Sequence, residues 1–477
     1  MATTFVGREQ ETLMLKELMA GENPQLVAIL GRRRVGKTYL VRQQCAANLV
    51  FECSGTIDGS TAMQLAHFAQ RLMHHFGVPA AATPGNWSDA FFMLEQCINS
   101  LPENKKKVVF FDEFPWLDNH RSGFLAAFTY WWNMYGSRRR NLVTIICGSA
   151  TSWMIQRVVN NKGGLHNRIT ERIHLSPFTL AETEIYLKSN GVKLTRYQIA
   201  QLYMVMGGIP HYLQSVKPGL SVEQVINEVC FNKNGLLSSE FHNLYAALFA
   251  HPEKHIALVK LLAGKRGGLT RSQMLEASRR LKSGGGLSKA LDELAECGFV
   301  YRLLPYQNRV KETVYRLADE YTHFYFRFLA STAAQPREWS KILPTAAFEQ
   351  WAGYAFETLC LRHIDQMKRG LGIGGVYTTQ SSWYAKGTSQ EPGAQIDLVI
   401  DRADNCIHLC EMKFSETPFT VTKKHADILW QKEQTFRQKT QVRKALFTTL
   451  IAPFGVAEND YRVQTVTHTL DLNCFFN

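Results

Sequence analysis

The chain has 477 residues, of which 45% are hydrophobic and 20% charged, so long disordered, collagen-like and low-complexity classes are excluded. Lysine and arginine number 54 against 41 acidic residues, and the formal charge of +13 favours a polyanionic partner, either nucleic acid or an acidic membrane surface. No apolar run approaches the roughly 18 residues that span a bilayer. The ten cysteines contain no C-x-x-C pair. We therefore expect a cytoplasmic protein without signal peptide or disulfides.

Residues 1–178 alternate short apolar runs with helix-period segments, which is the pattern of a parallel sheet with crossover helices. The residues thus predict an α/β domain whose buried strands are apolar throughout. The predicted strands lie at 26–30, 49–53, 107–111, 142–147 and 172–175, and the predicted helices at 61–76, 87–99 and 124–135.

The rest of the chain is predicted to form four segments of different structure. An all-helical segment is expected at 179–235. Residues 236–330 predict three helices followed by a two-stranded hairpin, which is the plan of a winged helix-turn-helix. Residues 331–344 contain two prolines and no clear period, so they are interpreted as a linker. A final domain, 345–477, is predicted to begin with a helix that extends to about Lys368 and to continue with strand-rich sequence.

The segment after the first predicted strand fits the pattern G-x-x-x-x-G-K-[ST] and opens a helix. Glycines in such a turn let successive backbone N–H groups point at a phosphate, and the helix N-terminus adds partial positive charge. Lys37 supplies a full charge to the β- and γ-phosphates, and Thr38 offers its hydroxyl to Mg²⁺. The predicted nucleotide-binding residues are Gly31, Arg32, Arg33, Arg34, Val35, Gly36, Lys37 and Thr38.

The third predicted strand ends in two carboxylates, Asp112 and Glu113, at the edge where open α/β sheets bind their ligands. Asp112 is expected to hold Mg²⁺ through water, and Glu113 to polarise the attacking water as a general base. Each motif alone can arise by chance, as a glycine turn or an acidic strand end. Together, each on the correct element of one sheet, they predict ATP binding and hydrolysis.

Three more polar residues are candidates for the same site. Ser149 follows a strand expected beside the phosphate loop, so it can contact the γ-phosphate or the water; the alternative is an ordinary Gly-Ser loop. Arg168 and Arg172 precede the helical segment, where an arginine can stabilise transferring charge, in cis or from a neighbouring subunit of a homo-oligomer. The alternative for both is a surface salt bridge. The sequence leaves the oligomeric state open.

These motifs, together with residues 5–9, 165–168 and 207–210, resemble those of the prokaryotic archaeal-type P-loop ATPases, which are related to the AAA+ and STAND ATPases. The resemblance extends over roughly residues 5–330. It implies an ASCE-type ATPase core with sheet order 5-1-4-3-2, a helical lid over residues 179–235 and a position near the adenine for residues 5–8.

The last domain carries carboxylates on two strands joined by a polar turn. Asp397 lies on the first strand, and Glu411 and Lys413 share one face of the second. A loop at 402–406 places Asp397 directly opposite Glu411, although like charges in that position destabilise a sheet. We therefore expect a metal ion between them, and carboxylate ligands suit Mg²⁺ or Mn²⁺.

This arrangement resembles the PD-(D/E)xK nuclease superfamily, which implies a restriction-endonuclease-like α/β fold. By that resemblance Asp397 and Glu411 are metal ligands, Lys413 activates the water, and Glu357 on the preceding helix is an auxiliary ligand. Ile396 stands where a proline often precedes the aspartate in that superfamily. The alternative is an exposed strand with an ordinary Glu–Lys pair.

Basic charge is concentrated in residues 254–316, which contain 13 lysines and arginines against 5 acidic residues. On the winged-helix interpretation this charge contacts DNA. The expected recognition helix, 288–297, contains one basic residue, Lys289, and three acidic residues. We therefore predict phosphate contacts rather than base reading, and the alternative is an interdomain spacer with a solvated basic face. The basic residues in question are Arg279, Arg280, Lys282, Arg302, Arg309 and Lys311.

The leading hypothesis is an ATP-binding and ATP-hydrolysing, DNA-associated protein whose nucleotide cycle controls a C-terminal Mg²⁺-dependent nuclease-like domain. The competing hypothesis is a regulatory ATPase switch whose nuclease-like domain is inert and docks DNA or protein. A membrane-surface ATPase is disfavoured because no basic amphipathic helix with exposed aromatic residues is visible. The expected cofactors are ATP and Mg²⁺, with Mn²⁺ as an alternative at the C-terminal site.

Overall fold

The computed structural model describes residues 5–78, 83–149, 151–159, 164–165, 167–249, 251–278, 281, 284–307, 313–330, 338–387 and 393–477. The chain divides into two compact units, the first ending at Ser176 and the second beginning at Pro177. Within the described residues, none of the helices has the length and apolar character needed to cross a membrane. The ten cysteines are free thiols.

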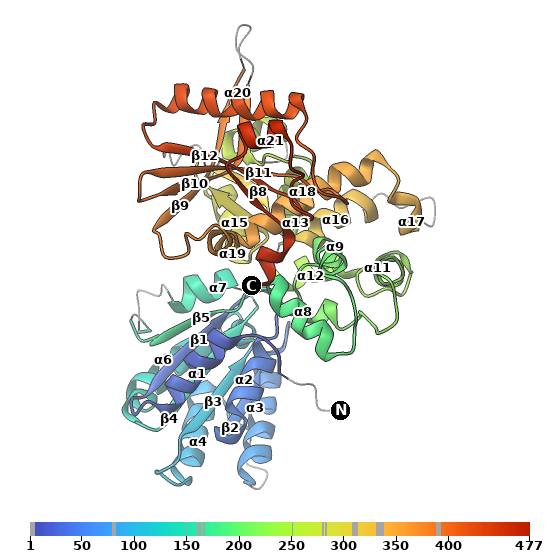
Figure 1. The fold of residues 1–477 in the computed structure, drawn as a ribbon. Helices are drawn as coiled ribbons and strands as arrows, with labels where there is room; N and C mark the ends of the chain where they lie inside the picture. Colours follow the sequence, from blue (N-terminus) through green and yellow to red (C-terminus); the bar gives the residue numbers. More distant parts are fainter. Residues whose placement is uncertain are drawn as a thin grey trace. The chain divides into compact units, whose positions relative to one another are not determined.

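A five-stranded parallel sheet forms the centre of the first unit (Figure 1). Its order is β2-β3-β4-β1-β5, which read from the β5 edge is 5-1-4-3-2. Every strand begins and ends within one residue of its predicted position, because continuous buried apolar runs mark these strands in the sequence. The strands are β1 (Gln25–Leu30), β2 (Leu49–Ser54), β3 (Lys107–Asp112), β4 (Leu142–Gly148) and β5 (Glu171–His174).

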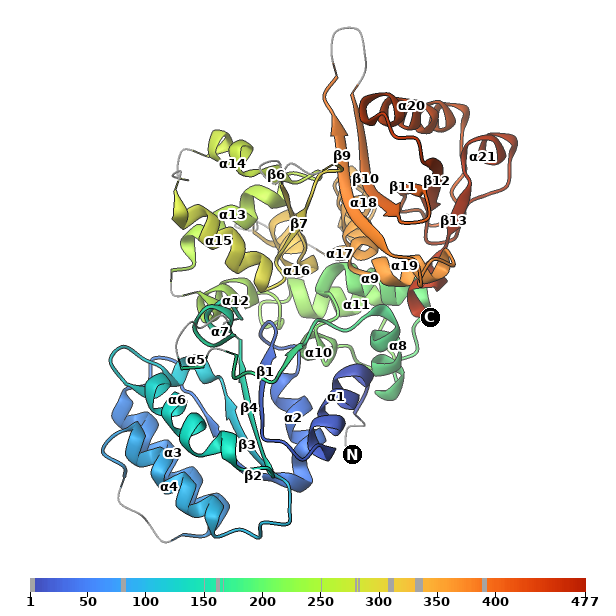
Figure 2. The ribbon, with the colours of Figure 1, turned by 90° about the vertical axis from the view of Figure 1, so that its left-hand side faces the viewer.

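Helices cover both faces of this sheet (Figure 2). On one face α3 (Thr61–Phe76), α4 (Trp87–Asn99) and α6 (Phe124–Met134) enclose a core rich in aromatic side chains. Ser60 and Asn86 cap α3 and α4 with their side chains, which explains why both helices begin where they were predicted. The other helices of this unit are α1 (Glu9–Ala20) and α2 (Lys37–Cys45) on the opposite face, and the short α5 (Phe114–Leu117) and α7 (Thr151–Met154).

The second unit begins with the predicted helical segment. Capping boxes at Thr179, Thr195 and Ser221 start three of its helices, since each box satisfies backbone N–H groups of the first turn. The helices are α8 (Leu180–Ser189), α9 (Arg196–Met206), α10 (Pro210–Leu213), α11 (Val222–Ile226) and α12 (Glu240–Leu248).

Three helices and a three-stranded antiparallel sheet of order β6-β8-β7 follow, where the winged-helix plan was predicted. Acidic residues of the third helix are paired inside this module: Asp292 accepts a hydrogen bond from Arg302 at 2.6 Å, and Glu293 lies 2.8 Å from His255 Nε2. The elements are α13 (Glu253–Ala263), β6 (Leu269–Thr270), α14 (Arg271–Ala277), α15 (Gly285–Glu296), β7 (Val300–Leu303) and β8 (Val314–Leu317). Outside the described residues lie Arg279, Arg280, Lys282, Arg309 and Lys311.

The linker prediction is wrong for its second half. Trp339 and Ile342 are buried on a short helix, α17 (Trp339–Ile342). The indole ring of Trp339 packs 5.4 Å from Phe324 of α16 (Glu320–Phe324), measured between ring centroids. Burial of this large aromatic side chain outweighs the lack of local helical period. The first half of the predicted linker, residues 331–337, lies outside the described residues.

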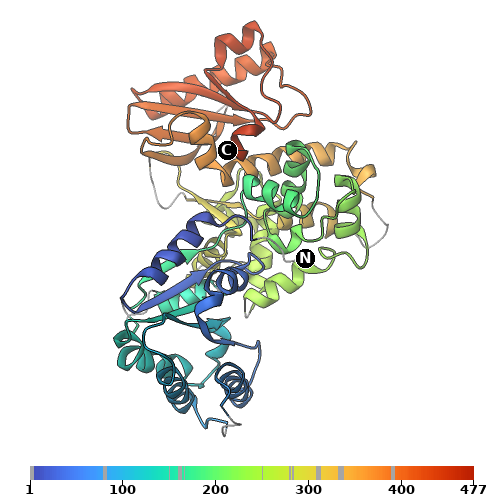
Figure 3. The same ribbon diagram turned by 60° about the horizontal axis from the view of Figure 1, so that its bottom comes forward.

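The C-terminal module has a five-stranded mixed sheet of order β13-β12-β11-β10-β9. α18 and α20 lie on opposite faces of it (Figures 2 and 3). Phe436 of α20 packs with Leu409, whereas α18 carries the interior residue Glu357. The elements are α18 (Ala346–Arg362), α19 (Ile364–Gly370), β9 (Thr378–Ala385), β10 (Ala394–Arg402), β11 (Cys406–Met412), α20 (Lys423–Thr440), β12 (Ala445–Ile451), α21 (Asp460–Thr465) and β13 (His468–Leu470).

One long helix was predicted from residue 346 to about Lys368, but the chain breaks it at His363. The imidazole of this buried histidine contacts the carbonyl oxygen of Leu359 at 2.8 Å through Nδ1, and its Nε2 accepts a hydrogen bond from Leu180 N–H at 3.0 Å. Burial lowers the pKa of His363 to about 4, so the ring is neutral and can accept that bond. This long-range contact has no signature in the local sequence.

Candidate functional site: a phosphate loop and a carboxylate–lysine pocket

The predicted phosphate loop connects β1 to α2. Gly31 has φ +147° and packs so closely that a Cβ there would meet Leu175 O at 2.4 Å. Gly36 has φ +95°, and a Cβ there would meet nothing within 4 Å, so open space adjoins the start of α2. Glycine is needed at both positions because residues with a Cβ rarely adopt these backbone conformations. The loop therefore leaves room beside a helix N-terminus, as an anion site requires.

Lys37 is 5% exposed and points back into this loop. Its ammonium group donates to the carbonyl oxygens of Gly31 (2.9 Å) and Arg32 (3.0 Å) and to Ser149 Oγ (3.1 Å). These three acceptors are neutral, although a buried cation is costly without a counter-charge. The loop thus offers a buried positive charge that an anionic phosphate would complement better than the present partners do.

Asp112 ends β3 next to the first residues of α2. Its Oδ2 accepts a hydrogen bond from Thr38 Oγ1 at 2.8 Å, so the two predicted Mg²⁺-binding side chains are brought together. Its Oδ1 accepts from the buried Cys147 Sγ at 2.8 Å and from Glu113 N–H at 3.0 Å. The carboxylate is therefore held in one orientation by its neighbours, with oxygen donors of the type that Mg²⁺ prefers.

Glu113 and Ser149 form the third part of the site. Glu113 has φ +44°, a left-handed conformation that is costly for a residue with a Cβ and is typical of functional sites. Its carboxylate accepts from Ser149 N–H at 3.0 Å and from Ser149 Oγ at 2.6 Å. Ser149 thus links the predicted base, Glu113, to Lys37, a connection that the sequence did not predict.

Of the remaining predicted residues of this site, some adjoin the phosphate loop and others are exposed without contacting it. Arg8 donates to Val35 O at 3.1 Å, and the ring of Phe5 stacks on Tyr39 with centroids 5.9 Å apart, so the segment predicted near the adenine adjoins the phosphate loop. Arg168 and Arg172 are exposed. In the described part of the chain, neither side chain shows a hydrogen bond or ion pair with the phosphate loop, so their catalytic role stays a prediction.

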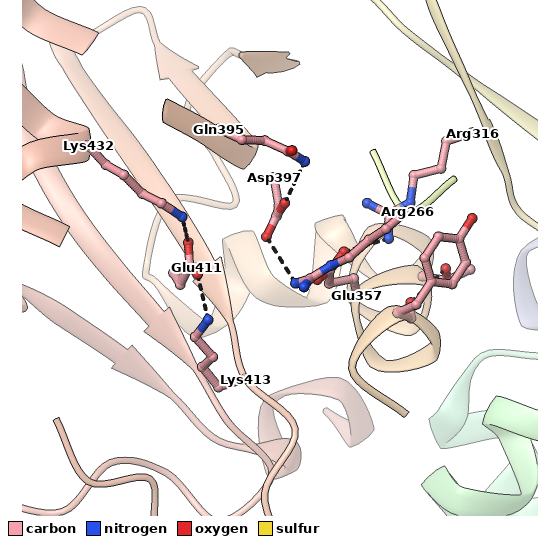
Figure 4. A network of polar contacts seen from close by, with 10 residues as sticks. Arg266, Arg316, Glu357, Gln395, Asp397, Glu411, Lys413 and Lys432 are labelled. Atoms are coloured by element: carbon pink, nitrogen blue, oxygen red, sulfur yellow. Dashed lines mark hydrogen bonds and ion pairs between the residues drawn. The ribbon is translucent and has the colours of Figure 1, made fainter. Parts of the chain in front are cut away.

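The C-terminal carboxylates come together on β10, β11 and α18 (Figure 4). Leu398 pairs with Cys410 and Val399 with Leu409, and this register, continued by one residue, would set Asp397 opposite Glu411. Lys413 follows the end of β11 and donates to Glu411 Oε1 at 2.7 Å. Asp397, Glu411 and Lys413 line a pocket of about 270 Å³. The other residues that line it are Arg266, Gln395, Ile428 and Lys432.

Basic side chains already contact these carboxylates. Lys432 of α20 donates to Glu411 Oε2 at 2.7 Å, so both oxygens of Glu411 are engaged. Glu357 is 0% exposed, and its two oxygens accept from Arg266 and, at 2.7 Å, from Arg316. Asp397 lies 3.9 Å from Arg266 and accepts from Gln395 Nε2 at 3.2 Å. Four cations thus surround three buried carboxylates.

The surroundings of Asp397 and Glu411 shift the pKa values of these two carboxylates in opposite directions. Burial, together with the charges of Glu357 and Glu411, raises the pKa of Asp397 to about 6. Burial alone would also raise the pKa of Glu411, but Lys432 and Lys413 outweigh it and lower that pKa below its usual value. The charge of Glu411 is therefore secured by the two lysines, while Asp397 is the carboxylate least compensated for its burial.

The predicted metal site is not assembled in this arrangement. Among the residues that the structure describes, no group of three His, Cys, Asp or Glu side chains is placed to hold a metal ion. Side-chain cations hold both oxygens of Glu357 and of Glu411, so the carboxylates as they stand do not fit Mg²⁺ or Mn²⁺. The expectation that these three residues share an ion is therefore not met here, because arginine and lysine supply the countercharge.

Comparison with known proteins identifies the type of domain that contains the phosphate loop. Residues 5–216 match the model of an ATPase domain found predominantly in Archaea. A Walker-type ATPase of Pyrococcus abyssi has the same fold over 68% of this chain and 96% of its own, with a TM-score of 0.51 and 17% identity. The ORC2 protein of Aeropyrum pernix aligns over 67% of this chain and 92% of its own, with a TM-score of 0.45 and 16% identity.

An uncharacterized protein of Methanocaldococcus jannaschii is 23% identical over 435 residues, which are 90% of this chain and 92% of that protein. The ATPase-family match and the geometry around Lys37 agree, so the chain contains a P-loop ATPase domain. The match ends at residue 216 and therefore does not extend to the carboxylate–lysine pocket.

Four residues that contact the three carboxylates were missed by sequence reasoning: Arg266, Arg316, Gln395 and Lys432. Arg266 had a local signal, because it lies in the glycine-rich stretch Gly264-Lys-Arg-Gly-Gly268. Gln395 also had one, two residues before Asp397. Arg316 and Lys432 had none, since their partners lie 41 and 21 residues away in the chain.

Proposed function

We propose that the N-terminal unit binds ATP with Mg²⁺ and hydrolyses it at the site formed by Lys37, Thr38, Asp112, Glu113 and Ser149. The observation that carries this proposal is the buried ammonium group of Lys37, whose hydrogen-bond partners are all neutral oxygens. The chemistry supplied by ATP and its metal is phosphoryl transfer to water.

Each residue has a role that follows from its contacts. Lys37 neutralises the phosphates, and Thr38 and Asp112, which are already hydrogen-bonded, would hold the metal. Glu113 accepts the proton of the attacking water as general base. Ser149 orients Glu113 through two hydrogen bonds, at 2.6 and 3.0 Å, and so acts as a positioning residue.

Lys37→Ala should raise the Kd of the full-length protein for a fluorescent ATP analogue by about 10- to 100-fold, because a charge-assisted contact of roughly 1.5–3 kcal/mol is lost. Fluorescence titration measures the change. Lys16→Ala on α1 is the matched control, since it removes the same charge from an exposed position. Equal affinities of wild type and Lys37→Ala, or no saturable binding of any purine triphosphate by wild type, would remove the phosphate-binding role.

We propose as a second function that the C-terminal pocket hydrolyses DNA phosphodiester bonds and is controlled by the nucleotide state of the ATPase domain. Support comes from the convergence of Asp397, Glu411 and Lys413 on one pocket, and from three cations that line it and complement a phosphate: Arg266, Lys413 and Lys432. The net charge of +13 favours association with DNA through its phosphates.

DNA cleavage by wild type and by Glu411→Ala, with Mg²⁺ and with or without ATP, tests this second function. We expect cleavage by wild type in the presence of ATP and a rate at least about tenfold lower for Glu411→Ala. Glu416→Ala serves as the control because this glutamate is exposed close by in the chain. Absence of cleavage by wild type on linear, supercoiled and branched DNA would favour a regulatory ATPase whose C-terminal domain only docks partners.

A further inference from the structure

The carboxylate–lysine pocket presents cations to solvent and keeps its carboxylates beneath them. The side chains of Asp397 and Glu411 are 6% and 9% exposed. Those of Arg266, Lys413 and Lys432 are 54%, 33% and 21% exposed. Each ammonium group carries three N–H donors, of which Glu411 accepts one from each lysine, so further acceptors can bind. A group that enters the pocket therefore meets positive charge, which suits an anion and not a divalent cation.

The cations approach from two sides (Figure 4). Lys413 and Lys432 contact the two oxygens of Glu411, whereas Arg266 lies on the side of Asp397, 3.9 Å from its Oδ2. The four cations around the three carboxylates leave an excess of one positive charge. A phosphodiester carries one negative charge and two non-bridging oxygens, so its charge matches this excess and each oxygen can face one side.

Arg266 reaches the pocket from the loop between α13 and β6. Gly268 in this loop has φ +74°, and a Cβ there would meet Tyr315 O at 2.5 Å, so this position requires glycine. A Cβ at Gly267 would lie 3.2 Å from Gln395 Nε2, so the loop runs along the rim of the pocket. The backbone thus holds Arg266 at the pocket, which reduces the ordering that an incoming ligand would have to impose.

An exposed aromatic side chain adjoins these cations. Tyr384 of β9 pairs in register with Gln395 of β10, whose side chain lines the pocket. Residues directly opposite each other in an antiparallel sheet share a face, with Cβ atoms about 5 Å apart. Tyr384 is 66% exposed, whereas its neighbour Trp383 is buried in the core on the other face. A solvent-exposed ring therefore lies beside the phosphate-sized, cationic pocket.

We propose that the pocket binds single-stranded DNA without a metal ion, with its three cations on one phosphodiester and the ring of Tyr384 stacked on an adjacent unpaired base. Bases inside a duplex are already stacked on both faces, so this arrangement selects single strands. Side-chain cations take the place that the nuclease resemblance gives to a metal ion. The inference deepens the second proposed function and rests on it for the choice of DNA as the partner.

Fluorescence anisotropy of a labelled oligothymidylate of about 15 nucleotides, titrated with the full-length protein in EDTA without nucleotide, tests the proposal. Tyr384→Ala should raise the Kd at least about fivefold, the loss expected for one base–aromatic stack. Tyr384→Phe retains the ring and should keep the Kd within about twofold of wild type. Tyr377→Ala is the matched control, because this tyrosine is 76% exposed, and it should bind like wild type.

Arg266→Gln tests the phosphate contact through its dependence on salt. Loss of this cation should raise the Kd at least about fivefold at low salt. It should also reduce the slope of log Kd against log salt by about 0.7, the value for one phosphate of a single strand. Tyr384→Ala should leave that slope unchanged, since stacking releases no counterions. Lys341→Gln is the charge control, because this lysine of the same unit is 72% exposed, and it should bind like wild type.

The outcomes separate this proposal from the hydrolysis on which it builds. A wild-type Kd shared by Tyr384→Ala or by Arg266→Gln, or binding that requires Mg²⁺, would overturn it. So would a duplex competitor as effective as a single strand of the same length. Binding that depends on both residues without any cleavage would refute hydrolysis alone, and cleavage unaffected by either substitution would refute this proposal alone. Thermal unfolding curves that coincide with that of wild type show that the variants are folded.

Discussion

Glu113→Gln is expected to lower ATP turnover at least about a hundredfold while changing the affinity for ATP by less than about twofold. Glutamine has nearly the same shape, and its side-chain oxygen can still accept a hydrogen bond from Ser149 N–H. It carries no charge and cannot take the proton of the attacking water. Steady-state phosphate release measures turnover, and fluorescence titration with an ATP analogue measures binding on the same preparations.

Two controls give this result its meaning. Glu22→Gln changes an exposed carboxylate of the same unit and should leave turnover unaltered. Ser149→Ala keeps Glu113 charged but removes one of its two side-chain hydrogen bonds, so we expect its turnover to lie between that of wild type and that of Glu113→Gln. Turnover retained by Glu113→Gln would exclude the general-base role, whatever its effect on affinity.

Arg316→Met is expected to lower the free energy of unfolding of the second unit by about 3–5 kcal/mol. The substitution preserves much of the apolar side-chain volume but leaves Glu357, which is 0% exposed, with Arg266 as its cationic contact. A buried carboxylate that loses one of its two cationic partners is costly because no water solvates the freed oxygen. Equilibrium unfolding in urea, followed by far-ultraviolet circular dichroism, measures the loss.

The adjacent strand supplies a matched control. Arg302 of β7 also donates to a carboxylate at 2.6 Å, that of Asp292, but both side chains are more than 40% exposed. Arg302→Met should therefore cost at most about 1 kcal/mol. The double variant Arg316→Met/Glu357→Gln should recover part of the loss, since the buried charge is gone. Equal costs for Arg316→Met and Arg302→Met would show that Glu357 is not a buried charge that depends on Arg316.

The ATPase site could be predicted closely because its chemistry is encoded locally. Residues 31–38 form a continuous turn and helix start, and Asp112 and Glu113 mark the end of a fully buried strand. What the prediction lacked was the hydrogen bond of Ser149 to both Lys37 and Glu113. That contact depends on strands β3 and β4 being neighbours, and on the left-handed backbone of Glu113, neither of which local sequence specifies.

At the C-terminal site, distant contacts decide more than the local sequence does. The register of β10 and β11, which pairs Leu398 with Cys410, followed from loop length and strand period, since both act over a few residues. The protonation and pairing of the carboxylates at this site did not, because their partners Arg266, Arg316 and Lys432 come from other elements. Two errors in the predicted secondary structure of this half of the chain, at Trp339 and at His363, likewise involve contacts with distant residues.

Sequence alone therefore determined which residues of this protein can bind a triphosphate, because glycine conformations, helix starts and strand ends are set by neighbours in the chain. Tertiary structure alone decided the electrostatic state of Glu357, Asp397 and Glu411. Whether a buried carboxylate meets a metal ion or an arginine depends on which distant side chain is packed against it, and its free energy changes by several kcal/mol with that choice.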